Sequence, residues 1–263
     1  MCELLGMSAD PPTDIAFSFT GLMQRGGRTG PHKDGWGLTL YQGKGIRDFR
    51  DTGPGSTSEL AQAVLQRPLA GTVVIGHIRE ANVGPICLEN THPFTRELWG
   101  RHWTFAHNGQ LENINELPLE RFIPIGSTDS EYAFCWILNQ IVARFSPQDM
   151  NTAPFWQAVH ALCKSLNSYG VFNMLLSDGE TLACYCATQL CSITRRAPFA
   201  AAALKDANMR IESNRHSTLD DTVTIVATTP LTDDEQWQRF DKGELRLFRQ
   251  GKATVCEPAL HTA

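Results

Sequence analysis

Short apolar stretches, several of them alternating with polar residues, stand toward both ends of the chain. Valine, isoleucine, phenylalanine and threonine are common in them, and such residues suit the pleated, half-buried surface of a β-strand. The strands predicted on this basis are residues 35–42, 71–79, 102–107, 170–177, 181–187, 222–228 and 244–248. Ser177-Asp178-Gly179-Glu180 separates two of them and has the composition of a tight hairpin turn, so antiparallel pairing is expected.

The middle of the chain has apolar residues at helical spacing instead. One helix is predicted after Thr128-Asp129-Ser130-Glu131, which has the pattern of a capping box, with Thr128 as the cap and Glu131 reaching back to it. A second helix is expected to begin near Pro154, and a weaker one to cover residues 58–66. The apolar faces of the two stronger helices comprise Phe134, Ile137, Leu138, Ile141 and Phe145 in the first and Trp156, Val159, Cys163 and Leu166 in the second.

This order of elements predicts an α+β fold. Strands toward both ends, with helices between them, do not alternate regularly, which argues against a Rossmann fold or an α/β barrel. Residues 200–220 are irregular and are expected to form an excursion. No stretch is rich enough in proline, glycine or serine to mark a linker. We therefore expect one domain over residues 1–263, with a core of about residues 2–250.

Composition narrows the class of protein. The chain has 263 residues, of which 42% are hydrophobic and 19% charged, as in an ordinary globular protein with a sizeable core. A net charge of −5 argues against a nucleic-acid partner. No apolar run is long enough to cross a bilayer, and the N-terminus has acidic residues rather than a basic and then apolar leader. A cytoplasmic protein without a membrane partner is expected.

The eight cysteines are expected to be reduced thiols, because a large chain without a leader is typical of a reducing compartment. Cys135 and Cys163 fall in the predicted helices, where free cysteine behaves as a small core residue. Cys184 and Cys186 are two residues apart in a predicted strand and should share one face. The motifs C-x-x-C and H-E-x-x-H are absent, so neither a metal nor another cofactor is predicted.

Cys2 directly follows the initiator methionine and is the first candidate for chemistry. Removal of Met1 would leave a residue that carries both a thiol nucleophile and a free α-amino group. Such an amine can act as the base for its own side chain. Its ordinary pKa of about 7.7–8.0 leaves a useful fraction neutral at pH 7. A small second residue without a catalytic role is the alternative.

An arginine and an aspartate stand at the ends of predicted elements. Arg79 closes the apolar strand in Gly76-His77-Ile78-Arg79, where a guanidinium group can bind a carboxylate through two hydrogen bonds. A surface ion pair is the alternative. Asp129 lies in the first turn of a predicted helix, where a carboxylate can hold an ammonium group. Its alternative role is to interact favourably with the helix dipole.

Two glycine-containing segments complete the set of candidates. Asn108-Gly109 follows a predicted strand, and its side-chain amide and backbone N–H can form an oxyanion hole. A simple turn is the alternative. Gln24-Arg25-Gly26-Gly27 is a glycine-rich loop that lacks the P-loop sequence. A structural surface loop is the alternative there.

Together these motifs resemble the class II glutamine amidotransferases, the cysteine branch of the N-terminal nucleophile hydrolases. In the order of the family, the matching motifs are Cys2, Arg25-Gly26, Gly76-His77-Ile78-Arg79, Asn90-Thr91-His92-Pro93-Phe94, His107-Asn108-Gly109 and Thr128-Asp129-Ser130-Glu131. The resemblance implies a four-layer αββα sandwich, in which two antiparallel sheets pack face to face between helices. It also implies hydrolysis of L-glutamine to glutamate and ammonia.

The resemblance implies a role for each matching residue. Cys2 is the nucleophile and its amine the base, and Asn108 and Gly109 form the oxyanion hole. Arg79 and Asp129 bind the charged groups at the amino-acid end of the substrate. His92, Arg25 and Gly26 join them as substrate-binding residues.

Three departures from the family pattern leave the substrate open. Glu80 stands where an aromatic residue is common, Asn82 where threonine is common, and Cys2-Glu3 replaces Cys-Gly. The loop between Gly26 and Asp34 also looks longer. No nucleotide-binding motif remains for a synthetase, so the chain resembles a stand-alone member that delivers ammonia to a separate synthase subunit. Hydrolysis of a modified γ-glutamyl amide or peptide is an alternative, and a non-catalytic binding subunit is another.

Overall fold

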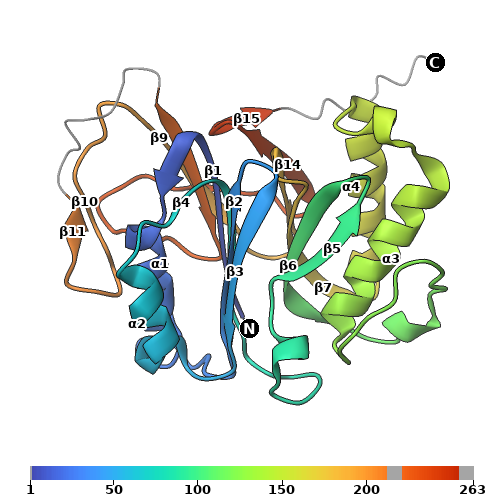
Figure 1. The fold of residues 1–263 in the computed structure, drawn as a ribbon, viewed down its shortest axis with the longest axis horizontal. Coiled ribbons are helices and arrows are strands. Elements are labelled where there is room, and N and C mark those ends of the chain that lie inside the picture. The colour runs from blue at the N-terminus through green and yellow to red at the C-terminus, as the bar shows by residue number, and fades with distance from the viewer. Residues whose placement is uncertain (1, 212–220, 255–263) are drawn as a thin grey trace.

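The computed structural model describes residues 2–211 and 221–254 of the chain. Within them two antiparallel sheets lie face to face, and helices cover the outer side of each sheet (Figure 1). This is the αββα sandwich that the resemblance implied. Met1 and residues 212–220 of the expected excursion lie outside the described residues.

One sheet has seven strands and the other has six. In spatial order the larger sheet consists of β13 (Gln238–Arg239), β9 (Cys191–Arg196), β12 (Thr222–Ala227), β1 (Glu3–Asp14), β4 (Ala70–Ile78), β2 (Trp36–Gln42) and β3 (Gly45–Asp51). The smaller sheet consists of β15 (Lys252–Thr254), β14 (Glu244–Arg249), β8 (Thr181–Cys186), β7 (Gly170–Ser177), β6 (Arg101–Leu111) and β5 (Phe94–Leu98). A separate two-stranded pair is formed by β10 (Ala202–Ala203) and β11 (Arg210–Ile211).

The helices cover the sheets in pairs, α1 and α2 on the larger sheet and α3 and α4 on the smaller (Figure 1). Their bounds are α1 (Ala16–Arg25), α2 (Glu59–Leu65), α3 (Asp129–Arg144) and α4 (Ala153–Asn167). The described residues also form short 3-10 turns, which in chain order are η1 (Gly55–Thr57), η2 (Leu88–Asn90), η3 (Ile114–Glu116) and η4 (Pro147–Asp149). No helix among the described residues is long and apolar enough to span a bilayer.

Three hydrophobic clusters separate the four layers. One lies under α1 and α2, one under α3 and α4, and a third between the two sheets. The alternation of β1 joins two of them, because Leu4 points into the layer between the sheets while Leu5 and Met7 point toward α1. Cys184 and Cys186 share the layer between the sheets, as their spacing predicted.

The seven predicted strands are all present, and the turn at residues 178–180 joins β7 to β8 as expected. The sequence pattern missed the helix α1. In the part of the two main sheets before residue 200, it also missed the strands β1, β3, β5 and β9. β1 is buried on both faces over its first half, so its residues do not alternate between apolar and polar. Helix α1 has no side-chain hydrogen bond at its N-cap, so it lacked a start signal.

The predicted capping box of α3 is only half correct. Thr128 Oγ1 accepts a hydrogen bond from the Glu131 N–H at 3.2 Å. The Glu131 carboxylate does not reach back to Thr128, and it accepts instead from the Gly126 N–H at 2.7 Å and pairs with Arg96. An arginine on the neighbouring β5 competes for this carboxylate and redirects it. The helix also ends before Phe145, which is extended.

Candidate active site

Cys2 stands at the start of β1, near the lower end of both sheets (Figure 1). Glu3 pairs with Ile78 of β4, so the residues that follow β4 lie beside the thiol. The Glu80 N–H nitrogen is 3.3 Å from Cys2 Sγ, and Sγ is 3.6 Å from the Glu80 carbonyl oxygen. The thiol is therefore held against the segment that follows β4.

Asn108 and Gly109 lie on β6 of the opposing sheet, so the interpretation of Asn108-Gly109 as a turn is wrong. A Cβ atom added to Gly109 would lie 1.8 Å from the Val171 carbonyl oxygen, so only glycine fits this register. Asn108 is buried; its Nδ2 is 3.4 Å from Thr228 Oγ1, and its Oδ1 has no partner among the described residues. Asn108 is not among the residues that line the cavity beside Cys2, so its role as an oxyanion donor stays a prediction.

A small cavity brings most of the expected residues together. It is lined by Cys2, Arg79, Glu80, Asn82, Val83, His92, His107, Gly109, Thr128, Asp129 and Ser130. These residues come from the starts of β1 and α3, from β6, and from the loop after β4. Its volume is about 30 Å³. That is room for about two water molecules, whereas pockets that hold small-molecule ligands usually exceed about 300 Å³.

Arg79 is buried beneath the loop that follows it. Its guanidinium group donates to the carbonyl oxygens of Pro85 at 3.0 Å, Val83 at 3.0 Å and Gly84 at 3.3 Å. Asn90 fastens this loop, since its Nδ2 donates to the Pro85 oxygen at 3.1 Å and its Oδ1 accepts from the Ser127 N–H at 2.8 Å. The loop itself therefore holds the group expected to bind a substrate carboxylate.

Asp129 reaches the cavity from the first turn of α3. One carboxylate oxygen accepts from the Leu111 N–H at 2.7 Å, and the other lies 3.4 Å from Ser130 Oγ. Ser130 Oγ in turn lies 2.8 Å from Nδ1 of His107. Asp129 thus ties the helix to the end of β6 and also presents a negative charge to the cavity.

A sequence profile described as glutamine amidotransferases class-II matches residues 1–262. The chain belongs to this family. It is 53% identical to "Putative glutamine amidotransferase YafJ" of Escherichia coli (strain K12) over 255 residues, which is 97% of this chain and 100% of that protein. It is 40% identical to a Haemophilus influenzae protein with the same family name, over 96% of this chain and 85% of that protein.

Solved structures agree with this membership. The crystal structure of a "predicted glutamine amidotransferase" from Pseudomonas aeruginosa PA01 superposes with a TM-score of 0.76 at 45% identity, over 97% of this chain and 100% of that one. Glutamine phosphoribosylpyrophosphate amidotransferase from Bacillus subtilis superposes with a TM-score of 0.63 at 15% identity, over 97% of this chain and 49% of that one. The second likeness shows the shared αββα fold.

Three buried histidines lie close together beside Cys2, and two of them, His92 and His107, line the small cavity. The ring centroids of His77 and His92 are 4.2 Å apart. His77 Nε2 lies 3.1 Å from the backbone carbonyl oxygen of His107. Burial lowers the pKa of His77 to about 3 and that of His92 well below its ordinary value. Burial also lowers the pKa of His107, against the opposing charge of Asp129. All three rings are therefore neutral at pH 7.

The Cys2 thiol needs a base. Burial raises its pKa to about 11, and the hydrogen bond from the Glu80 backbone and the positive charge of Arg79 oppose that rise without cancelling it. A thiol with this pKa is protonated at pH 7 and is a weak nucleophile. Among the described residues no buried histidine forms a hydrogen bond with Sγ, whose contacts are with the Glu80 backbone.

Arg25 and Gly26 are not among the residues that line the cavity. The Arg25 guanidinium group pairs with Glu3 at 3.1 Å and Asp206 at 2.7 Å, and it also donates to Thr229. Arg25 thus compensates the negative charge of Glu3, the residue that stands in place of glycine in the Cys-Gly pattern. Gly26 donates its N–H to the end of α1. Contact of these two residues with substrate stays a prediction that the arrangement does not favour.

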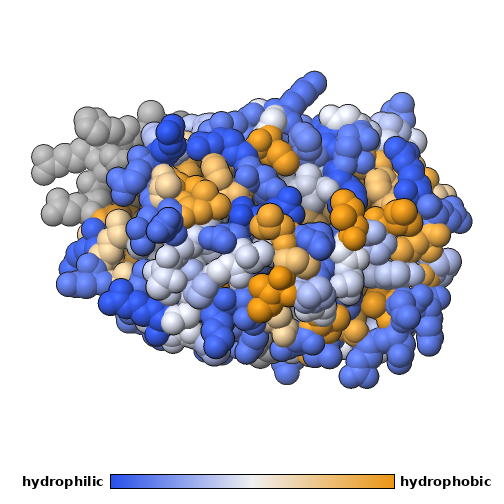
Figure 2. Space-filling view, turned by 60° about the horizontal axis from the view of Figure 1, so that its bottom comes forward, coloured by the Kyte–Doolittle hydropathy of each residue, from blue (hydrophilic) through white to orange (hydrophobic). Residues whose placement is uncertain are grey.

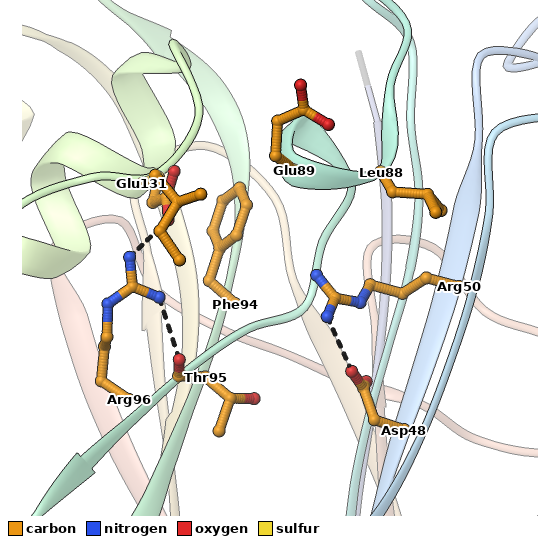
Figure 3. Close-up of a pocket in the computed structure, with 9 residues that line it drawn as sticks. Asp48, Arg50, Leu88, Glu89, Phe94, Thr95, Arg96 and Glu131 are labelled. Carbon is orange, nitrogen blue, oxygen red and sulfur yellow. Dashed lines mark hydrogen bonds and ion pairs between the residues drawn. The ribbon is translucent and has the colours of Figure 1, made fainter.

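A wider cleft lies on the other side of His92. It has a volume of about 400 Å³ between the edge strands β3 and β5. Figure 3 shows Arg50 and Arg96 entering it from opposite sides, paired with Asp48 and Glu131. Phe94 lies between them, and its ring centroid is 4.3 Å from that of His92. The His92 and Phe94 rings therefore lie between this cleft and the cavity that Cys2 lines.

Large apolar side chains are exposed on the loops around this cleft. Ile86, Leu88, Ile123 and Ile125 are each more than half exposed. Figure 2, which brings the bottom of Figure 1 forward, shows hydrophobic groups scattered among polar residues on this face. The apolar residues do not form a continuous patch in this view.

Several cavity residues were not predicted from the sequence. His107 and Ser130 belong to motifs that match the family, but the sequence analysis assigned no site role to them. Val83 was not predictable, because its carbonyl oxygen and not its side chain binds Arg79. Among the described residues no cluster of three or more histidine, cysteine, aspartate or glutamate side chains could hold a metal ion.

Proposed function

We propose that the chain hydrolyses the side-chain amide of L-glutamine to glutamate and ammonia through a thioester on Cys2. The observation that carries the proposal is the meeting of Cys2, Gly109, Arg79 and Asp129 in one cavity. These groups come from four separate segments of the chain. Membership in the class-II glutamine amidotransferases supports the same reaction.

The proposed first step needs the free α-amine of Cys2. The neutral amine takes the thiol proton, and Sγ attacks the amide carbon of glutamine. The carbonyl oxygen becomes an oxyanion, which the Gly109 N–H and the Asn108 amide stabilise. The ammonium group then returns its proton to the leaving nitrogen, and ammonia departs as the carbon–nitrogen bond breaks.

Water completes the reaction. It attacks the thioester carbon with the same amine as base, and glutamate and the free thiol are released. Arg79 would bind the α-carboxylate and Asp129 the α-ammonium group throughout, which orients the amide toward Sγ. The raised pKa of the thiol supports this scheme, because an unassisted thiol would be almost fully protonated at pH 7.

Substrate entry requires the loop of residues 80–87 to move. The cavity of about 30 Å³ is too small for a glutaminyl group. The carbonyl oxygens of Val83, Gly84 and Pro85 occupy the donors of Arg79. A substrate carboxylate would replace those carbonyl oxygens, so binding and loop opening are the same event in this proposal.

The released ammonia would pass to a separate synthase subunit. The family profile covers residues 1–262, which supports treating this stretch as one amidotransferase domain. Hydrolysis of a γ-glutamyl amide other than glutamine remains the second candidate, because Glu80 and Asn82 line the cavity where the family pattern differs.

Glutamate release tests the proposal. Protein whose N-terminus is Cys2, verified by intact mass, should convert glutamine to glutamate and ammonia, and Cys2→Ala should abolish this without lowering thermal stability. Cys163→Ala serves as the matched control, since Cys163 is a buried thiol in α4 far in sequence from the site. Equal turnover in Cys2→Ala and Cys163→Ala would refute the proposal.

A further inference from the structure

His107 is a buried histidine that the proposed reaction does not use, although it lines the cavity beside Cys2. Both nitrogens of its ring have a partner. Nε2 lies 2.9 Å from the Val171 carbonyl oxygen, and Nδ1 lies 2.8 Å from Ser130 Oγ. The backbone is held as well, because the His107 carbonyl oxygen lies 3.1 Å from His77 Nε2. The ring is therefore fixed in place, with Nδ1 against Ser130.

The partners of the ring determine its tautomer. A carbonyl oxygen can only accept a hydrogen bond, so Nε2 carries the proton that it shares with Val171. Burial lowers the pKa of His107, so the ring is neutral at pH 7 and Nδ1 carries no proton. The Ser130 hydroxyl is therefore the donor in its contact with Nδ1.

Ser130 has one hydroxyl proton and two acceptors within reach. Nδ1 of His107 lies 2.8 Å from its oxygen, and Oδ1 of Asp129 lies 3.4 Å from it. A hydroxyl group donates a single hydrogen bond, so the shorter contact takes the proton. The histidine ring thus holds the Ser130 proton away from the carboxylate.

The two oxygens of the Asp129 carboxylate have different surroundings. Oδ2 accepts from the Leu111 N–H at 2.7 Å, which ties α3 to the end of β6. Among the described residues the polar neighbour of Oδ1 is Ser130, whose hydroxyl donates elsewhere. Asp129 lines the cavity, so Oδ1 is the oxygen left to accept from the ammonium group of a substrate.

We infer that His107 is a positioning residue for substrate binding: by accepting the Ser130 hydroxyl proton at Nδ1, it keeps Asp129 Oδ1 free for the α-ammonium group. This inference rests on the proposed function and gives a role to a residue that the reaction leaves unused. Without an acceptor at Nδ1, the Ser130 hydroxyl would turn to Asp129 and compete with the substrate for Oδ1. One competing hydrogen bond to a charged group is strong enough to raise the KM for L-glutamine on the order of tenfold.

Two substitutions of His107 separate the roles of the two ring nitrogens. His107→Gln keeps a donor at the ε position for Val171 but has no acceptor at the δ position. His107→Asn has an acceptor at the δ position, where Nδ1 stands, and loses the donor to Val171. Glutamate release by protein that begins at Cys2 should show a KM raised on the order of tenfold in His107→Gln. His107→Asn should recover most of that rise.

Removing the hydroxyl from the His107→Gln protein makes the sharpest comparison. Ser130→Ala added to His107→Gln should bring the KM back toward the wild-type value, because no competing proton remains. Ser168→Ala in the same protein is the matched control, since its hydroxyl donates to the Ser165 carbonyl oxygen in α4 and lines no part of the cavity. If His107 only supported the fold, Ser130→Ala would leave the KM of His107→Gln unchanged or raise it further.

A measurement on the wild type does not depend on whether any variant folds. Nitrogen-15 NMR of protein with labelled histidine should show His107 at pH 7 with Nε2 protonated and Nδ1 unprotonated. A proton on Nδ1 would overturn the inference, and so would a wild-type KM in His107→Gln.

The Ser130→Ala comparison can overturn the inference as well. It does so if the KM of His107→Gln does not fall, or if Ser168→Ala lowers that KM equally. Each of these results, obtained with a wild type that hydrolyses L-glutamine, overturns the inference alone. No glutamate release by the wild type would overturn the proposed function and the inference with it.

Discussion

Two asparagines that face each other across β6 and β7 should respond in opposite ways to the same substitution. Asn108 and Asn173 are cross-strand partners, and both are buried. Asn108 has a single long contact, from Nδ2 to Thr228 Oγ1 at 3.4 Å, and its Oδ1 has no partner among the described residues. Asn108→Ala should therefore lower the free energy of unfolding by no more than about 1–2 kcal/mol.

Asn173 has a different environment. Its Nδ2 donates to the backbone carbonyl oxygen of Asn108 and to Thr188 Oγ1. Its Oδ1 accepts from the backbone N–H groups of residues 187, 188 and 189. Asn173→Ala removes all of these and leaves buried partners unsatisfied. At about 0.5–1.5 kcal/mol for each hydrogen bond, the loss of stability should reach about 3–5 kcal/mol.

Activity should follow the reverse order. If Asn108 donates to the oxyanion, Asn108→Ala should lower kcat on the order of 10²–10³, which corresponds to about 2.7–4 kcal/mol. The assay is glutamate release at saturating glutamine, paired with chemical denaturation of each variant. Wild-type turnover in Asn108→Ala would refute the oxyanion role. A loss of stability equal to that of Asn173→Ala would show instead that Asn108 is structural.

Three further predictions concern groups around the cavity. Arg79→Lys loses the planar fork and Asp129→Asn the charge, so both should raise the KM for glutamine, whereas Asp129 acting only at the helix end would lower the melting temperature and leave KM unchanged. Asn90→Ala removes the hydrogen bond to the Pro85 carbonyl oxygen that fastens the loop over the cavity. Iodoacetamide should therefore alkylate Cys2 faster than in the wild type at equal pH. Burial lowers the pKa of His77 to about 3, so the unfolded chain binds a proton that the folded chain does not. His77 alone should therefore lower stability by about 1.4 kcal/mol per pH unit as the pH drops below about 6.5. His92 and His107 should add to this slope, and His77→Phe should make it shallower.

The elements with a local signal were predictable. Strands such as β7 carry apolar runs bounded by turn residues, and α3 follows a true cap at Thr128. β1 was not predictable from alternation, because helices cover one of its faces and the second sheet the other. The edge strand β3 carries charges at Arg47, Asp48 and Arg50, which hide its pairing with β2.

The candidate residues divide in the same way. Cys2, Arg79, Asp129 and Gly109 could be singled out because the chemistry proposed for them depends on side-chain type or on glycine itself, and the fold brings them to one cavity. The Arg25 motif was matched on sequence order alone, which does not reveal that a nearby Glu3 and a distant Asp206 hold the guanidinium group. Contacts through backbone carbonyl oxygens, like those on Arg79, leave no mark on residue type.

The central claim is that the α-amine of Cys2 is the base of an N-terminal nucleophile. Its most direct test compares glutamate release by two forms of the chain, one beginning at Cys2 and one with a non-removable extension before Cys2, each verified by intact mass. Both should unfold at a similar temperature, because the contacts of Cys2 Sγ with the Glu80 backbone do not depend on the extension. We predict hydrolysis by the first form and none by the second. Equal hydrolysis by the extended form would contradict the account.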